Sequence, residues 1–268
     1  MNEIKPVKCR LDANSADIKY LEWDSGIFGF KIGRLGNIRL DKNEKTAGRF
    51  INRIIKSCRK QHYRHINCRI GTGDFLALWA LEKNGFNVAD IQVTLSTGGK
   101  PKKKTVKLPG FSVVKACEDD LDGMRCVTRD AFTDTRVVRD PNYPRVKVDR
   151  FYYEWIKNSM FNKRQAVFLA KENKSKELAG FVICDVLGEI GFIDLISVNK
   201  RKRGRGIGSA LVGAAMNWFS DNSVEAEVRT QASNTAAIET FTKGGFRHLV
   251  PGKAVPSGIS MHYWFTKG

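Results

Sequence analysis

The chain has 268 residues, 42% of them hydrophobic, which is enough for one large globular domain or two ordinary ones. No apolar run approaches the roughly 20 residues that span a bilayer, and the N-terminal segment lacks the apolar core of a signal peptide, so a cytoplasmic protein without a membrane interaction is expected. The net charge of +18 indicates anionic ligands, although no nucleic-acid-binding motif is visible. The six cysteines show no CxxC spacing and no histidine partner at ligand spacing, so no metal is expected.

The first half alternates between strand-like and amphipathic segments. Strand composition broken by turn glycines occupies 19–38, and an amphipathic helix with a basic outer face is predicted over 42–61. A strand over 62–70, a helix over 74–86 and a strand over 89–98 follow.

A basic linker, "GGKPKKKTVKLPG", precedes a longer alternation in the second half. The predicted strands are 110–117, 165–172, 177–186, 190–198, 224–230, 246–251 and 259–267. The predicted helices are 118–132, 148–160, 206–220 and 234–245, with a loop over 133–144. The linker "NKSK" joins two of these strands as a hairpin.

The two halves share a short pattern, which suggests a partial repeat. "LEKNGF" (81–86) and "FTKGGF" (241–246) each end a helix and enter a strand. We therefore expect an N-terminal α/β domain over 1–99 that contributes to substrate binding and packing, a linker over 100–109 and a second domain over 110–268.

The segment "RKRGRGIGSALVGAA" (201–215) lies between a predicted strand and a predicted helix. A helix start exposes unpaired N–H groups and favours anions, and Gly206 and Gly208 would let phosphate oxygens reach them. Arg203 and Arg205 can add charge-assisted hydrogen bonds. The GxxxxGK[ST] pattern of a P-loop is absent, and the glycine spacing does not match GxGxxG. A pyrophosphate site of a third type remains.

The stretch "LISVNKRKRGRGIGSALV", followed by "TQASNTAAIETFTKGGF", resembles the GNAT superfamily of acyl-CoA N-acyltransferases over 110–268. In that family the motif [RQ]-x-x-G-x-[GA] binds the CoA pyrophosphate. The resemblance implies a GNAT fold of the α/β class, with a mixed, mostly antiparallel central sheet flanked by helices. It implies acetyl-CoA or another acyl-CoA as co-substrate and no metal. The cofactor-binding residues implied are Ile196, Val198, Arg203, Gly204, Arg205, Gly206, Ile207, Gly208, Ser209 and Asn234.

A narrower resemblance extends into the first half. "LEWDSGIFGFKIGRL" (21–35), "TRVVRDPNYP" (135–144), "FYYEWIKNSM" (151–160) and "RTQASN" (229–234) look like the bacterial dTDP-amino-sugar acyltransferases, notably the dTDP-fucosamine (dTDP-4-amino-4,6-dideoxygalactose) acetyltransferase group of surface-polysaccharide (O-antigen) biosynthesis. The partners implied are acyl-CoA and a nucleotide-linked amino sugar, and a homodimer stays open. The substrate-binding candidates are Trp23, Asp24, Arg136, Arg139, Asp140, Tyr153 and Gln231.

The resemblance also assigns catalytic roles by position. The backbone N–H of Ile196 would stabilise the oxyanion, and Asn234 would contact CoA as well as cap a helix. Many family members carry a tyrosine that protonates the thiolate where this chain has Phe241. Here another group, such as Tyr152, Tyr153 or Tyr263, or water protonates the thiolate, or the thiolate leaves unassisted. Asp194 lies two residues before Ile196 on the same strand, which puts both side chains on the same face, and it either acts as a base through water or satisfies a neighbouring donor.

Two other functions stay open at this stage. The chain fits a GNAT enzyme that acts on a protein or another small amine. It also fits a CoA-binding module with a decayed catalytic site, because the usual tyrosine is missing.

Overall fold

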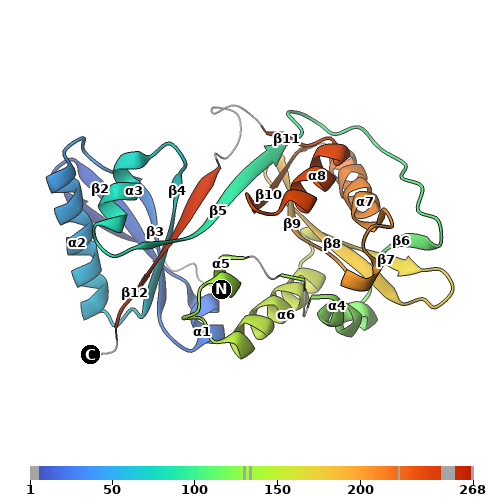
Figure 1. Ribbon diagram of the computed structural model, residues 1–268, viewed down its shortest axis with the longest axis horizontal. Helices are drawn as coiled ribbons and strands as arrows, with labels where there is room; N and C mark the ends of the chain where they lie inside the picture. Colours follow the sequence, from blue (N-terminus) through green and yellow to red (C-terminus); the bar gives the residue numbers. More distant parts are fainter. Residues whose placement is uncertain (1–5, 129–130, 133–134, 223, 249–256, 267–268) are drawn as a thin grey trace. The chain divides into compact units, whose positions relative to one another are not determined.

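The computed structural model describes residues 6–128, 131–132, 135–222, 224–248 and 257–266 (Figure 1). The chain forms two compact units. The N-terminal unit comprises residues 1–92, 136–148 and 257–268, and the C-terminal unit comprises 93–135 and 149–256. Within the described ranges, no helix combines the length and apolar character that a membrane crossing requires.

The N-terminal unit is built on a sheet whose strands follow the order β1 (Val7–Leu11), β2 (Asn14–Tyr20), β3 (Ile32–Arg39), β4 (His65–Gly71), β12 (Gly258–Trp264) and the first part of β5 (Asn87–Ser96). Neighbouring strands are antiparallel except β3 and β4, which are parallel. Helices α2 (Glu44–Lys60) and α3 (Phe75–Glu82) bury their apolar residues against one face of this sheet. The unit also contains α1 (Glu22–Phe28) and α5 (Arg136–Arg139).

In the C-terminal unit the strand order is β5, β10 (Glu225–Gln231), β9 (Ile190–Val198), β8 (Leu178–Leu187), β7 (Gln165–Glu172) and β6 (Phe111–Lys115), with β11 (Arg247–His248) beside β5. Its β9 and β10 are parallel, and β6 to β9 are antiparallel. Helices α7 (Ile207–Asp221) and α8 (Thr235–Gly244) lie on one side, while η1 (Glu118–Asp120), α4 (Leu121–Thr128) and most of α6 (Arg145–Phe161) lie on the other (Figure 1).

The fold class is therefore the predicted one, a mixed and mostly antiparallel α/β architecture. The N-terminal unit repeats part of the C-terminal one, because β3–α2–β4–α3 and β9–α7–β10–α8 are both a parallel strand–helix–strand unit followed by a helix. The repeated motif adopts the same turn in both. The Phe86 N–H donates to the Leu81 carbonyl and the Phe246 N–H to the Phe241 carbonyl, each at 3.1 Å.

Two short helices depart from the sequence-based expectations. The segment 19–38 contains α1, which ends at Gly29 with φ +74° and is held at its start by a 2.6 Å hydrogen bond from the Ser25 hydroxyl to the Leu21 carbonyl. The expected loop over 133–144 contains α5. Residues 129–130, 133–134, 249–251 and 267 of the expected elements lie outside the described residues.

The two compact units have different boundaries from the domains expected from the sequence. Both 136–148 and the C-terminal strand β12 belong to the N-terminal unit. The expected linker 100–109 lies along α7, where Lys104 N–H donates to Asn217 Oδ1 at 2.7 Å and Asn217 Nδ2 donates back to the Lys104 carbonyl at 2.9 Å. This basic segment is thus part of the C-terminal unit.

Candidate functional site

The turn after β9 presents an open helix start. Gly204 and Gly206 have φ of +77° and +79°, a left-handed conformation that favours glycine. Gly206 is the N-cap of α7 and has no side chain to cap the first N–H groups, which therefore point outward at the positive end of the helix dipole. A Cβ at Gly206 would have no neighbour closer than Leu108 Cδ1 at 3.9 Å. The arrangement leaves room for an anion at the predicted position.

Two cationic side chains next to this turn make contacts within the protein that stabilise it. The Arg203 Nε donates to the Val198 carbonyl at 3.3 Å, and the buried Lys202 pairs with Glu172 at 3.0 Å and Glu177 at 2.7 Å. Arg205 stays exposed. A cavity of about 530 Å³ beside the turn is lined by Cys126, Val127, Ala131, Glu177, Asn199, Lys200, Arg201, Lys202 and Arg203. This volume is within the range of small-molecule sites.

The remaining predicted CoA residues surround the same helix start. Ile207 is buried in the core, whereas Gly208 and Ser209 are partly buried in the first turn. A Cβ on Gly208 would lie 3.4 Å from Thr240 of α8 and 3.9 Å from Val198 of β9, so this glycine allows the three elements to converge. Asn234 caps α8, its Oδ1 accepting from the Ala237 N–H at 3.1 Å.

Strands β9 and β10 separate where the predicted pantetheine residues lie. Their parallel register runs from Ile190↔Glu225 to Ile193↔Val228 and stops there. Ile196 and Val198 lie beyond this point and keep β8 as their partner strand, opposite Val182 and Gly180. Backbone groups on the β10 side of this stretch are therefore placed to bond a ligand between the strands.

A β-bulge lies at Asp194. In the β8–β9 register Ile183 faces Leu195 and Cys184 faces Ile193, so Asp194 is the extra residue. The bulge breaks the alternation: Ile193 and Ile196 both pack with the α7 core, while the Asp194 carboxylate accepts from Gln165 on the other face. The expectation that Asp194 and Ile196 share a face is wrong for this reason.

Asp194 is a carboxyl group poised to exchange a proton near neutral pH. Burial, and next the nearby Asp185 carboxylate, raise the pKa of Asp194 to about 6, against the opposing influence of Arg164 and Arg229. Gln165 Nε2 donates to Asp194 at 3.0 Å and to Asp185 at 3.1 Å. A pKa in this range beside a strand opening is typical of a general base.

The facing strand adds charged residues that the sequence analysis missed. Glu227 is 1% exposed, and its Oε2 lies 3.8 Å from Arg229. The Arg229 guanidinium lies 5.6 Å from the ring centroid of Phe192 and also influences Asp194. The alternation in "EAEVRT" could have predicted that Glu225, Glu227 and Arg229 share one face of the strand.

Three other predicted residues have visible packing roles. Phe241 is 2% exposed, with its ring 5.9 Å from that of Phe246, so it belongs to the core. The Arg125 guanidinium lies 5.0 Å from the Tyr153 ring centroid. Gln231 ends β10, and its carbonyl accepts from the Asn234 N–H at 3.0 Å.

The N-terminal unit collects most of the predicted acceptor residues. It contains Trp23 and Asp24 on α1, Arg136 and Arg139 on α5, and Asp140 just after α5. Tyr153 and Gln231 belong to the C-terminal unit instead.

Arg34 and Arg136, both in the N-terminal unit, act electrostatically on the carboxyl group of Asp24. Burial and next Arg136 lower the pKa of Arg34, which Asp24 offsets in part. Burial raises the pKa of Asp24, while Arg136 and Arg34 oppose that rise. The Arg34 side chain is exposed to solvent. Two neighbouring guanidinium groups, one of them exposed, favour an anionic ligand.

Asp140 fastens the segment after α5 to β12. His262 Nδ1 donates to Asp140 Oδ2 at 2.6 Å, and Trp264 Nε1 donates to the same oxygen at 2.7 Å. Burial alone would raise the pKa of Asp140, but these hydrogen bonds hold it well below its usual range. Sequence analysis missed His262 because nothing local connects residues so far apart in the chain.

The N-terminus of α2, the corresponding helix of the N-terminal repeat, is capped by side chains, unlike that of α7. Asn43 Oδ1 accepts from the N–H groups of Lys45 and Thr46, at 3.0 and 3.3 Å, and Asp41 accepts from Asn43. Side chains thus occupy the position at α2 that is open at α7. Only one of the two repeats presents a free anion site at this position.

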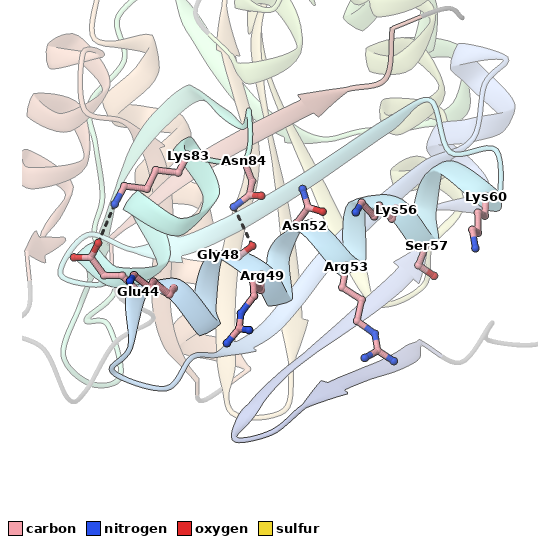
Figure 2. Close-up of a pocket in the computed structure, with 11 residues that line it drawn as sticks. Glu44, Gly48, Arg49, Asn52, Arg53, Lys56, Ser57, Lys60, Lys83 and Asn84 are labelled. Atoms are coloured by element: carbon pink, nitrogen blue, oxygen red, sulfur yellow. Dashed lines mark hydrogen bonds and ion pairs between the residues drawn. The ribbon is translucent and has the colours of Figure 1, made fainter.

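A pocket of about 1220 Å³ lies on the outer face of α2, and Figure 2 shows the side chains that line it. Its lining is mostly cationic and polar: Glu44, Lys45, Gly48, Arg49, Asn52, Arg53, Lys56, Ser57, Lys60, Lys83 and Asn84. Lys83 pairs with Glu44 at 2.8 Å, and Asn84 donates to the Gly48 carbonyl at 3.2 Å. None of the predicted site residues lines it, and we interpret it as a solvated basic helix face.

The described part of the chain contains no cluster of three or more histidine, cysteine or acidic residues suited to a metal ion.

Comparison with known proteins finds an acetyltransferase family model and solved structures of similar fold. The family model Acetyltransferase (GNAT) family matches residues 127–246. No curated protein matches the chain. Similar solved structures include a GCN5-related N-acetyltransferase from Sphaerobacter thermophilus, with 15% identity, a TM-score of 0.64 and coverage of 94% of this chain and 76% of that one. Matches under 25% identity show a shared fold.

Two further structures resemble the whole chain, N-terminal unit included. A tandem GNAT protein from the clavulanic acid biosynthesis pathway has 11% identity and a TM-score of 0.61, with 94% of this chain and 79% of that one covered. A GCN5-related glucosamine N-acetyltransferase region of a fungal multi-domain β-N-acetylglucosaminidase has 11% identity and a TM-score of 0.60, with 94% and 31% covered.

Proposed function

We propose that this protein acylates the amino group of a nucleotide-linked amino sugar. Residues 127–246 match the acetyltransferase (GNAT) family model. Such a domain makes the protein an enzyme of the EC 2.3.1 type. The donor is acyl-CoA, with acetyl as the simplest acyl group. The acceptor is a dTDP-linked amino-deoxy sugar of the kind used for surface polysaccharides, and transfer occurs by direct attack in a ternary complex.

The observation that carries the choice of acceptor is the pair Arg34 and Arg136. Each acts on the Asp24 carboxyl, so the two positive charges lie close together in the N-terminal unit. Guanidinium groups match the geometry of phosphate oxygens, and two neighbouring ones suit a diphosphate. The likeness in fold to a glucosamine N-acetyltransferase region supports an amino sugar as the group to be acylated.

The donor site follows from the C-terminal unit. The CoA pyrophosphate binds the open start of α7 at Gly206, and the pantetheine arm bonds the backbone of Ile196 and Val198 where β9 leaves β10. The N–H of Ile196 stabilises the oxyanion of the tetrahedral intermediate.

Asp194 is the proposed proton acceptor. The neutral sugar amine attacks the thioester carbonyl, the C–N bond forms and the C–S bond breaks. The amine proton passes through water to Asp194, whose pKa of about 6 leaves it largely ionised at neutral pH. Phe241 has no proton to give, so water protonates the departing thiolate.

The experiment that tests the acceptor compares Arg136→Ala with Arg139→Ala in steady-state kinetics against both substrates. Arg136 is one of the two guanidinium groups beside Asp24, and Arg139, the other arginine of this helix predicted to bind the acceptor, is exposed. Losing a hydrogen bond to a charged group costs roughly 1–3 kcal/mol, or about 5- to 150-fold in KM. We expect Arg136→Ala to raise the KM for the dTDP-amino sugar by that factor and to leave the KM for acetyl-CoA unchanged. A loss of affinity for acetyl-CoA alone, in both variants, would contradict this placement.

A further inference from the structure

Four buried side chains on one face of the N-terminal sheet have polar atoms that lack partners. They are His65 and Asn67 of β4 and Ser260 and His262 of β12, with exposures of 0, 6, 2 and 2%. Within the described residues, His65 Nε2, Asn67 Nδ2, Ser260 Oγ and His262 Nε2 have no hydrogen-bond partner. The four lie together, since β4 and β12 are neighbours and Asn67 faces His262 in the register. Buried polar groups are normally paired, so these four atoms are available to hydrogen-bond a ligand.

The hydrogen bonds at the other ends of these side chains determine what each orphaned atom offers. His65 Nδ1 lies 3.1 Å from the Tyr263 carbonyl and His262 Nδ1 lies 2.6 Å from Asp140, and both of these oxygens can only accept. Each Nδ1 therefore carries the proton. Burial lowers the pKa of both histidines, so both are neutral and each Nε2 presents a lone pair.

Asn67 supplies a donor beside these two acceptors. Its Oδ1 accepts from Arg34 Nε at 3.3 Å, so its Nδ2 is the end that faces the cluster unbonded. The same contact joins the cluster to Arg34, one of the two guanidinium groups assigned to the diphosphate. A ligand group that lies next to a phosphate and carries hydroxyl or amine hydrogens matches this set.

An aromatic wall borders the histidine pair. The Trp264 ring stacks on His65 with centroids 4.2 Å apart, and Tyr143 and Phe30 lie 5.0 and 5.4 Å from Trp264. The two imidazole rings are 4.7 Å apart. These ring contacts fix the orientation of the two imidazoles, and with it the direction from which each Nε2 can accept a hydrogen bond.

We propose that His65, Asn67, Ser260 and His262 form the subsite that binds the sugar ring of the acceptor through its hydroxyl and amine hydrogens. The identity of that acceptor rests on the proposed function, while the subsite itself rests on the orphaned atoms. Sugar N–H or O–H groups donate to the two Nε2 atoms, and Asn67 Nδ2 donates to a sugar oxygen.

The test separates the sugar from the nucleotide. Calorimetry measures the affinity for dTDP and for dTDP-4-amino-4,6-dideoxygalactose in His65→Asn and His262→Asn. Asparagine retains a donor near the Nδ1 position, towards Tyr263 or Asp140, and removes the Nε2 acceptor. His62→Asn, at an exposed histidine of the same unit, is the matched control. We expect each buried variant to weaken the sugar nucleotide about tenfold and to leave dTDP unchanged. Equal changes for the two probes, or none, would overturn the proposal.

A second measurement uses the unmodified protein. In ¹⁵N spectra of the histidine side chains, the unprotonated Nε2 signals of His65 and His262 should shift when the sugar nucleotide is added and should not shift with dTDP. If neither nucleotide binds, the proposed function fails, and galactosamine and galactose become the probes. Movement of both Nε2 signals with these sugars would still support a sugar subsite, and no movement with any probe would show that water alone occupies it.

Discussion

Gly206→Asp is expected to abolish binding of acetyl-CoA. The new carboxylate stands at the open start of α7, where the pyrophosphate would bind, and like charges in contact cost several kcal/mol. A cost of about 3 kcal/mol already weakens binding more than 100-fold. Isothermal calorimetry with acetyl-CoA measures the loss.

Gly206→Asn is the matched control, because asparagine has the same shape without the charge and also tolerates the left-handed conformation. A Cβ at this position meets nothing closer than 3.9 Å, so both variants should fold. We expect Gly206→Asn to retain most of the affinity. Equal weakening by both variants would show that charge at this position is irrelevant, and unchanged affinity in Gly206→Asp would place the pyrophosphate elsewhere.

Asp194→Asn is expected to lower kcat by about 10²- to 10⁴-fold, the usual contribution of a general base, with acetyl-CoA affinity preserved. A base works in its deprotonated form, and the pKa of Asp194 is raised to about 6. The kcat/KM of the wild type should therefore fall as the pH drops through about 6, and Asp194→Asn should lose this limb. The pH profile of kcat/KM is the measurement.

The neighbouring carboxylate gives a directional control for the same experiment. Asp185 raises the pKa of Asp194 through charge repulsion, so Asp185→Asn should move the limb to lower pH without removing it. An unaltered acid limb in Asp194→Asn would mean that another group accepts the proton, and that the role of Asp194 is to receive the Gln165 hydrogen bond.

The sequence predicted those features that depend on residues close together in the chain. The glycine turn before α7, the amphipathic helix α2 and the hairpin β7–β8 depend on residues within a few positions of one another, and all three form where expected. The short helix α1 was missed because "EWDSGIF" carries a glycine and β-favouring residues, and the Ser25 side chain that supports its first turn gives no helix signal in the sequence.

The features that could not be predicted depend on residues distant in the chain. Strand β12 pairs with β4 across nearly the whole length of the protein, which brings His262 beside Asn67. The bulge at Asp194 arises from its register with β8, and regular alternation gave the wrong face for that carboxylate. Phe241 was singled out for a missing hydroxyl, whereas its ring fills the core between α7 and α8.

Acyl transfer to a nucleotide-linked amino sugar is tested most directly by mass spectrometry of the products formed from a panel of dTDP-amino sugars with acetyl-CoA and longer acyl-CoAs. We expect one dTDP-amino sugar to gain a single acyl group on its amine, with free CoA released in equal amount. Binding of acetyl-CoA without a mass gain on any member of the panel would contradict the proposed acceptor and favour another amine substrate or a module that only binds CoA.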